Sequence, residues 1–271
     1  HAALIDAAAD GGKITSVTFA GKAQKITAEA DYFIDCTGDG NLAVMAGCEY
    51  TLGRESDNLC QPMTLCFRVG GIDKKAFFRE LPELTKKYQR FREDGKIKNP
   101  REDILVFDTM HDGVLHFNST RVIKLNPTDI FDVSRAEIEA REQVFELFDF
   151  IKSNGESFKK AAVLSTAAEI GVRESRMITG SHILTEEELL SCTKFADGIA
   201  ACNYDIDIHN PEGSGTSHHY FAPGEYYTIP YRCLCPVGIS NLLTAGRCIS
   251  STHEAQASYR IMPTVCTIGQ A

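Results

Sequence analysis

Residues 241–271 read NLLTAGRCISSTHEAQASYRIMPTVCTIGQA, and this stretch decides the fold class. Its first residues are apolar and predict a strand over residues 242–245, which a tight turn at Gly246 and Arg247 follows. A helix is expected to begin at Pro263, because proline is preorganised for the first turn of a helix. The backbone N–H groups just after this proline would then form a ready site for an anion.

Four other stretches add to this one, in a fixed order along the chain. They are DYFIDCTGDGNLAVMAGCEYTLGRE (31–55), EIGVRESRMITGSHILTEEELL (169–190), DIDIH (205–209) and YTIPYRCLCPVGISNLLTAGR (227–247). Together with the C-terminal stretch they resemble the FAD-dependent oxidoreductase family, flavoproteins of the two-dinucleotide-binding-domain type. Several motifs in register are more specific than any one of them.

The resemblance implies a fold of the α+β / α/β class, in which a partial FAD/NAD(P)-binding domain carries an inserted mixed α+β substrate domain. Residues 1–59 are expected to form the second part of the FAD-binding domain, with a β-meander, a strand, a TGD turn and a helix. Residues 60–235 would form the substrate or cap domain. Residues 236–271 would return to the FAD-binding domain with a strand, an AGR turn and a truncated helix.

The sequence contains no GxGxxG loop to hold the FAD pyrophosphate, although the family begins with one. Its glycine pair Gly11-Gly12 lies between two alternating runs and predicts a hairpin turn. The chain is therefore interpreted as a fragment that lacks the N-terminal GxGxxG segment and the end of the C-terminal helix. In isolation it is expected to be inactive.

The resemblance also implies which residues contact FAD. These residues come from three segments. They are Thr37, Gly38 and Asp39 of the first strand-end turn, Gly246 and Arg247 of the second, and Met262, Pro263, Thr264 and Val265 at the start of the last helix. Glycine permits close backbone approach, arginine offers a fork to phosphate, and helix N–H groups favour an anionic reduced flavin. The alternative for the first turn is an ordinary strand-to-helix connection in which Asp39 or Asn41 caps the following helix.

The sequence signals for catalytic residues are weaker than those for the FAD contacts. His209 and His253 are candidate acid–base groups, because histidine titrates near neutral pH. Tyr231 and Arg232 follow a strand and could hold a carboxylate or a hydroxyl, and Arg173 lies in GVRESR beside Glu174 and Arg176. The alternative for this last motif is a junction salt-bridge network, and for the isolated histidines and arginines a solvated loop.

Several local elements are also predicted. Ser134 and Glu137 form a capping-box pattern at the start of a helix over residues 134–153. Three β-rich runs, ILVFDTM, VLHFNST and RVIKLNP, predict strands within 104–127. Cys233 and Cys235 alternate on what would be a strand.

The composition excludes some functions. A net charge of −9 argues against a nucleic-acid or anionic-membrane partner, although a few local arginines could still bind an anionic substrate. The ten cysteines include no CxxC pair, and adjacent His218-His219 would point apart on an extended chain, so no metal site is predicted. Buried thiols and the lack of an apolar run of roughly 20 residues suggest a soluble, cytoplasmic protein. Its partners are expected to be a small-molecule substrate and possible further copies in a homo-oligomer.

These observations predict a fragment of a bacterial-type FAD-dependent oxidoreductase that transfers a hydride between a small organic substrate and flavin. Two alternatives stay open. One is a non-redox, carbohydrate-active lyase or hydrolase on a flavoprotein-like fold, which would need paired carboxylates and an aromatic cleft. The other is a binding or assembly domain without catalytic activity.

Overall fold

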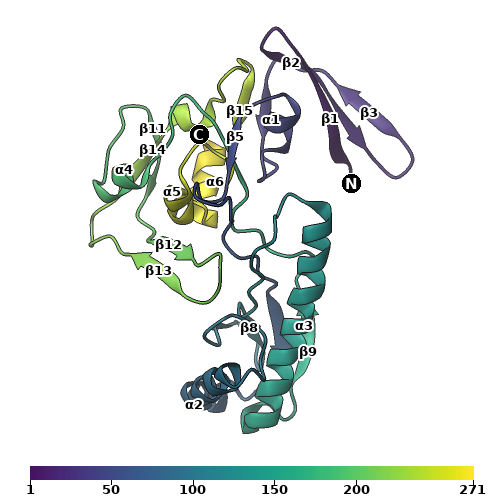
Figure 1. Ribbon diagram of the computed structural model, residues 1–271, viewed down its shortest axis with the longest axis vertical. Coiled ribbons are helices and arrows are strands. Elements are labelled where there is room, and N and C mark those ends of the chain that lie inside the picture. The colour runs from purple at the N-terminus through teal and green to yellow at the C-terminus, as the bar shows by residue number, and fades with distance from the viewer. The chain divides into compact units, whose positions relative to one another are not determined.

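The computed structural model covers residues 1–271 and shows a mixed α/β protein (Figure 1). It divides into two compact units. Unit 1 comprises residues 1–59, 174–208 and 217–271, and unit 2 comprises residues 60–173 and 209–216. None of the helices combines the length and the apolar character that a membrane crossing requires.

Unit 1 contains small sheets rather than one large sheet. An antiparallel meander consists of β1 (Ala3–Asp10), β2 (Lys13–Ala20) and β3 (Lys25–Ala28). The remaining strands of this unit pair two by two: β4 (Phe33–Asp35) with β15 (Leu242–Thr244), β5 (Tyr50–Leu52) with β10 (Arg176–Ile178), and β11 (Gly198–Cys202) with β14 (Tyr227–Pro230). A further pair, β12 (Ile206–His209) and β13 (Thr216–His219), has residues assigned to both units.

The turn between β1 and β2 is the predicted Gly11-Gly12 hairpin. Both glycines have positive φ angles, of 54° and 75°, which hairpin turns of two residues require. Ile14 and Val17 of β2 are both buried although they are three residues apart, because the pairing with β1 shifts register between Ile14 and Ser16 and interrupts the strict alternation.

The helices of unit 1 are short. They are α1 (Asn41–Met45), α4 (Glu186–Leu190), the 3₁₀ helix η2 (Tyr231–Leu234), α5 (His253–Tyr259) and α6 (Met262–Gln270). Two buried apolar clusters hold the unit together. One surrounds α5 and the β11–β14 pair and includes Tyr227, Ile229 and Tyr259, and the other joins β2, β4 and α1.

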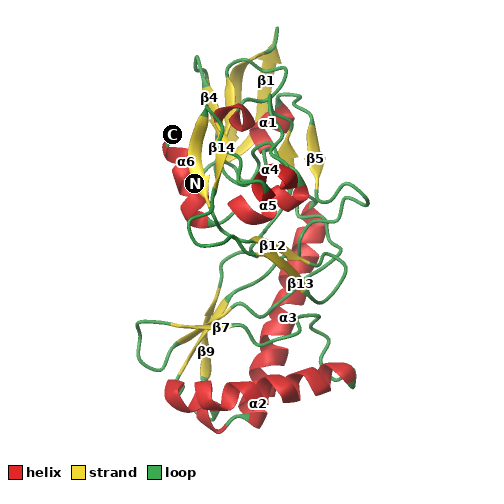
Figure 2. Ribbon diagram, turned by 90° about the vertical axis from the view of Figure 1, so that its left-hand side faces the viewer, coloured by secondary structure: helices red, strands yellow, loops and turns green.

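Unit 2 is an antiparallel sheet with two long helices. The sheet has the order β7 (Val106–Asp108), β8 (Leu115–Phe117), β6 (Phe67–Gly70) and β9 (Ala162–Thr166). The helices are α2 (Lys74–Glu93) and α3 (Ile130–Asn154), followed by the 3₁₀ helix η1 (Glu156–Phe158). Figure 2 shows α2 lying across the end of α3.

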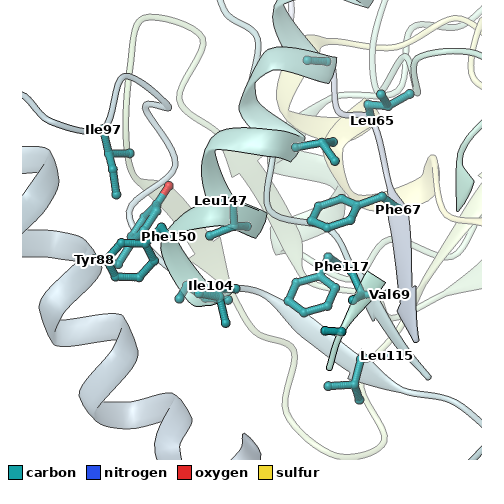
Figure 3. Close-up of a cluster of buried hydrophobic side chains, with 14 of the residues drawn as sticks. Leu65, Phe67, Val69, Tyr88, Ile97, Ile104, Leu115, Phe117, Leu147 and Phe150 are labelled. Atoms are coloured by element: carbon teal, nitrogen blue, oxygen red, sulfur yellow. The ribbon is translucent and has the colours of Figure 1, made fainter. Parts of the chain in front are cut away.

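Aromatic side chains fill the core of unit 2 (Figure 3). Phe67 of β6 and Phe117 of β8 stack with ring centroids 4.9 Å apart. Tyr88 of α2 meets Phe150 of α3 edge to face, with centroids 5.5 Å apart. Burial of such rings is the largest stabilising contribution that these side chains make.

Some predicted elements are wrong in detail. The helix expected from Ser134 begins at Ile130, because the Asp129 carboxylate accepts the N–H groups of Phe131 and Asp132 and caps it there. The run at 121–127 forms no strand and contributes only one isolated bridge, Met63 to Val122.

Two further expectations about the chain also need revision. Cys233 lies in η2, and Cys235 is the residue that ends this 3₁₀ helix, so the two do not alternate on a strand. The boundary expected near residue 60 coincides with the start of unit 2, but residues 174–208 and 217–235 belong to unit 1, where β10 pairs with β5, and β11 and β14 pack with α5. The assignment of cofactor and substrate binding to these parts remains a prediction.

Candidate functional site

The β4–β15 pair brings two distant parts of the chain together in unit 1. The two strands are parallel, with Phe33 opposite Leu242 and Asp35 opposite Thr244. Their carboxyl ends therefore lie side by side, and the loop after each strand starts at the same edge. Open α/β sheets bind ligands at the carboxyl ends of adjacent parallel strands.

Asp35 organises the loop after β4 and is itself buried. One of its carboxylate oxygens accepts the Thr37 N–H and hydroxyl at 2.9 and 2.7 Å, and the other accepts the Ala43 N–H at 3.0 Å. The Thr37 hydroxyl oxygen accepts the Asn41 N–H at 2.9 Å. Because Asp35 and Thr37 satisfy the start of α1, the expectation that Asp39 or Asn41 caps this helix is wrong.

Asp39 instead joins the two loops. Its Oδ1 accepts from Arg247 Nη2 at 3.2 Å and from the Ser175 hydroxyl at 2.6 Å. Arg176 Nη1 donates to the Asp39 carbonyl at 3.2 Å. Gly38 leaves room for this arrangement, because a Cβ at that position would lie 2.7 Å from Arg247 Nη2. The structure thus brings the two predicted strand-end turns into contact.

Arg247 is anchored on one side only. Its Nη1 is buried and has no hydrogen-bond partner, and its side chain is 24% exposed. Gly246 precedes it with a φ of +104° and has open space where a Cβ would stand. A guanidinium with an unused donor beside a glycine is suited to a phosphate-like group.

The start of α6 has the predicted proline in its first turn. The helix begins at Met262, which is 80% exposed, and Pro263 follows. The Val265 N–H donates to the Ile261 carbonyl at 3.0 Å, so the expectation that this N–H is free is wrong. The Thr264 side chain is buried, with its hydroxyl 3.3 Å from the sulfur of Cys202.

A cavity of about 470 Å³ lies against this helix start. Pro263 and Thr264 form part of its wall, and Tyr204, Asp205 and Tyr220 form another part. Burial, followed by the nearby Asp207 charge, raises the pKa of the Tyr204 hydroxyl. The cavity therefore combines a helix N-terminus with tyrosine side chains.

His253 forms a buried pair with Glu174 of the GVRESR motif. Its Nδ1 lies 2.6 Å from Oε1 of Glu174, and the two side chains are 5% and 0% exposed. Burial lowers the pKa of His253, but the hydrogen bond and charge of Glu174 raise it more, so that the net shift is upward.

His209 belongs to unit 2, where a buried arginine contacts it. Arg121 is 1% exposed, and its Nη2 lies 3.2 Å from His209 Nδ1. The same guanidinium donates to the carbonyls of Gly213 and Gly215 at 3.1 and 2.9 Å. The loop over residues 209–216 is therefore bound to the body of unit 2.

The other catalytic candidates are Arg173, Tyr231 and Arg232. Arg173 is in unit 2 and donates to the Pro62 carbonyl at 2.6 Å and to the Thr64 hydroxyl. Tyr231 and Arg232 follow β14 as predicted, in η2. Tyr231 is 41% exposed, and Arg232 pairs with Asp197 at 2.9 Å.

A cluster of possible metal ligands occurs where none is predicted. Ligand atoms of Asp205, Asp207 and His218 lie within 4.8 Å of one another. His218 Nδ1 is 2.6 Å from Asp205, and Arg260 contacts Asp207 at 3.3 Å. These contacts account for the cluster as a hydrogen-bonded set. The alternation in DIDIH is the sequence signal for it, because residues two apart share one face of a strand.

The sequence offered little indication that Glu174, Ser175, Arg176 and Arg121 would take part in these contacts. Glu174, Ser175 and Arg176 are consecutive in the GVRESR motif, but the pattern alone did not separate a site from a salt-bridge network. Arg121 lies in a run that predicted a strand and carried no functional signal.

Comparison with known proteins gives two similarities. The profile of the FAD dependent oxidoreductase family matches residues 1–271. No curated protein matches the chain. Among solved structures, the chain is similar to the myxobacterial chondrochloren halogenase, an FAD-dependent halogenase, with a TM-score of 0.36 and 14% identity. This alignment covers 66% of the chain and 37% of the halogenase chain.

Proposed function

Since the chain belongs to the FAD-dependent oxidoreductase family, we propose that it serves hydride transfer between a small organic substrate and FAD. One observation carries the proposal: Asp39 and Arg247 meet at the carboxyl ends of the parallel strands β4 and β15. This edge is where dinucleotide-binding sheets hold their ligand.

The residues present fit part of a dinucleotide. Arg247 offers a positive charge and a buried Nη1 without a partner, which suits a phosphate oxygen. Asp39 supplies a carboxylate, which suits a ribose hydroxyl. The start of α6, where Pro263 and Thr264 line the cavity, would supply backbone dipoles to an anionic ring system.

FAD, when bound, supplies the electron acceptor for the hydride, and the chain supplies binding, orientation and exclusion of water. Asp39 and Arg247 would hold the cofactor in register with the sheet edge. The cavity beside α6, with its tyrosines, would shield an apolar portion of cofactor or substrate from water.

The test is a titration of the purified chain with FAD, followed by the visible absorbance and by flavin fluorescence. Arg247→Ala removes the proposed phosphate contact. Arg135→Ala is the matched control, because Arg135 is 69% exposed on α3 and forms a comparable surface ion pair with Asp132. Thermal unfolding of each variant checks that the fold is retained.

We expect Arg247→Ala to weaken FAD binding at least tenfold, since a lost charge-assisted hydrogen bond is worth about 1.5–3 kcal/mol. The control should bind as the wild type does. Equal affinity in Arg247→Ala would contradict the role of this arginine. The wild-type chain, which has no GxGxxG loop, is titrated alongside a version to which such a loop is added, and failure of both to bind flavin would favour the non-redox or assembly alternatives.

A further inference from the structure

The two histidines that the sequence offers as acid–base groups differ in the chemistry of their partners. His253 is held by a carboxylate, and His209 is held by a guanidinium. A carboxylate accepts hydrogen bonds, whereas a guanidinium only donates them. The identity of the partner therefore fixes which ring nitrogen carries the proton.

At His253 the carboxylate of Glu174 faces Nδ1 at 2.6 Å. Nδ1 must then be the donor, and in the neutral ring the lone pair is left on Nε2. This is the tautomer in which a histidine takes a proton through Nε2, as the carboxylate–histidine pair of a serine hydrolase does.

At His209 the arrangement is reversed. Nδ1 lies 3.2 Å from Arg121 Nη2 and 3.2 Å from the Thr216 hydroxyl. Because a guanidinium has no lone pair to offer, Nδ1 accepts and Nε2 carries the hydrogen. Protonation of Nδ1 would break the bond to Arg121 and place two positive charges together. His209 is thereby kept as a neutral hydrogen-bond donor.

The position of Glu174 ties this pair to the proposed cofactor loop. Glu174 directly precedes Ser175, whose hydroxyl donates to Asp39 at 2.6 Å, and Arg176 binds the Asp39 carbonyl. His253 is the first residue of α5, where the Thr252 side chain caps the helix by accepting the Ala255 N–H. The positions of Glu174 and His253 are therefore fixed by hydrogen bonds that their sequence neighbours make: Ser175 and Arg176 to Asp39, and Thr252 to Ala255.

We propose that Glu174 is the positioning residue that makes His253, rather than His209, the proton acceptor of this protein. The inference rests on the proposed function for the proton's source. When a substrate O–H or N–H bond breaks, its proton goes to His253 Nε2 and its electron pair stays on the heteroatom. As the hydride leaves the adjacent carbon for FAD, that pair forms the double bond.

Charged groups on several neighbouring segments shift the pKa of His253. Glu174 and Glu254 favour the imidazolium, and Arg54 opposes it, as does burial. The pKa of Asp57 is lowered chiefly by its hydrogen bond from Arg54, and the His253 charge adds a smaller contribution in the same direction. Since the folded pKa of His253 is raised, its contribution to stability is complete below about pH 6.5 and is lost as the pH rises through the folded pKa.

The experiment is long-range proton–nitrogen NMR of the histidine rings in the uniformly ¹⁵N-labelled chain without FAD, from pH 5 to 9. A His253→Gln variant assigns the His253 signals. Glu174→Gln keeps the shape of the partner and removes its charge. Glu83→Gln is the control, because Glu83 is 77% exposed on α2.

We expect His253 of the wild type to carry its neutral-form proton on Nδ1 and His209 on Nε2. Glu174→Gln should lower the proton affinity of His253 roughly tenfold or more, the usual effect of a lost adjacent opposite charge. The control should leave it unchanged. An Nε2–H tautomer at His253 in the wild type would overturn the proposal even if Glu174→Gln does not fold, as would an unchanged titration in a folded Glu174→Gln.

The tautomers are measured without cofactor, so this result is independent of flavin binding. A chain with the expected tautomers that fails to bind FAD even when a GxGxxG loop is added would contradict the proposed function and leave the positioning of His253 by Glu174 intact. A chain that binds FAD but shows the opposite tautomer at His253 would refute the role of Glu174 alone.

Discussion

The replacement Gly38→Ala isolates the contact between the two strand-end turns. Gly38 has a φ of +81°, and a Cβ there would lie 2.7 Å from Arg247 Nη2. That atom is the end of a flexible side chain, so the guanidinium would move rather than the backbone. The hydrogen bond from Arg247 to Asp39, 3.2 Å long, would be lost.

Gly47→Ala is a matched control for this substitution. Gly47 follows α1 with a φ of +88°, and a Cβ there would meet nothing within 4 Å. Both substitutions place alanine in the left-handed region, which costs roughly 1–2 kcal/mol. Only Gly38→Ala also breaks an ion pair, and a partly exposed pair contributes up to about 1 kcal/mol.

Urea unfolding and FAD titration together test this reasoning. We expect Gly47→Ala to lower the free energy of unfolding by about 1–2 kcal/mol and to leave FAD affinity unchanged. Gly38→Ala should lose up to about 1 kcal/mol more and should weaken FAD binding about tenfold, because the displaced guanidinium no longer holds a phosphate. Equal stability and equal FAD affinity in the two variants would refute the proposed contact.

Three other outcomes follow from the contacts. Asp35→Ala removes the acceptor of three hydrogen bonds, so the free energy of unfolding in urea should fall by about 3 kcal/mol, and an unchanged midpoint would contradict its role. Arg121→Ala leaves two glycine carbonyls without a donor, so limited proteolysis should cleave loop 209–216 faster, whereas an equal rate would show that the guanidinium does not hold it. Burial, assisted by the Asp35 charge, raises the pKa of the Cys48 thiol to about 11, so iodoacetamide at pH 8 should modify it only in urea, as mass spectrometry would report.

Elements with a strong local signal could be predicted from the sequence. The strand over 242–245 and the helix at Pro263 are confirmed within one residue, as β15 and α6. The hairpin at Gly11-Gly12 is confirmed too. In each case the residues that decide the structure are neighbours in the chain, so pattern and turn chemistry suffice.

Helix starts were less predictable because several cap residues compete. Asp129, rather than Ser134, caps the start of α3. The Ser134 hydroxyl donates instead to the Ile130 carbonyl inside the helix. Ile130 and Phe131 are 75% and 76% exposed. An apolar pair that faces water follows no core periodicity, so the pattern contained no signal for this first turn.

The contacts of the site could be predicted least, because their partners are far apart in sequence. Asp39 and Arg247 are separated by 208 positions, and Glu174 and His253 by 79. The family resemblance identified Asp39 and Arg247 as candidates, and His253 was a candidate because histidine titrates near neutral pH. The sequence could not say that Asp39 contacts Arg247, nor that a carboxylate holds His253. Their roles with FAD and substrate remain predictions.

An anionic ligand at the sheet edge would depend on direct hydrogen bonds rather than on an excess of positive charge. The chain has a net charge of −9, and two carboxylates, of Asp35 and Asp39, accompany two guanidinium groups around the loop after β4. Asp35 accepts N–H and O–H groups of its own loop, and Arg247 pairs with Asp39. Arg176 binds neutral groups: the Asp39 carbonyl, the Asn41 amide oxygen at 2.9 Å and the face of Tyr50. Because the charges at this edge balance, the attraction for a phosphate would come from the charge-assisted hydrogen bond that the buried Nη1 of Arg247 can still donate.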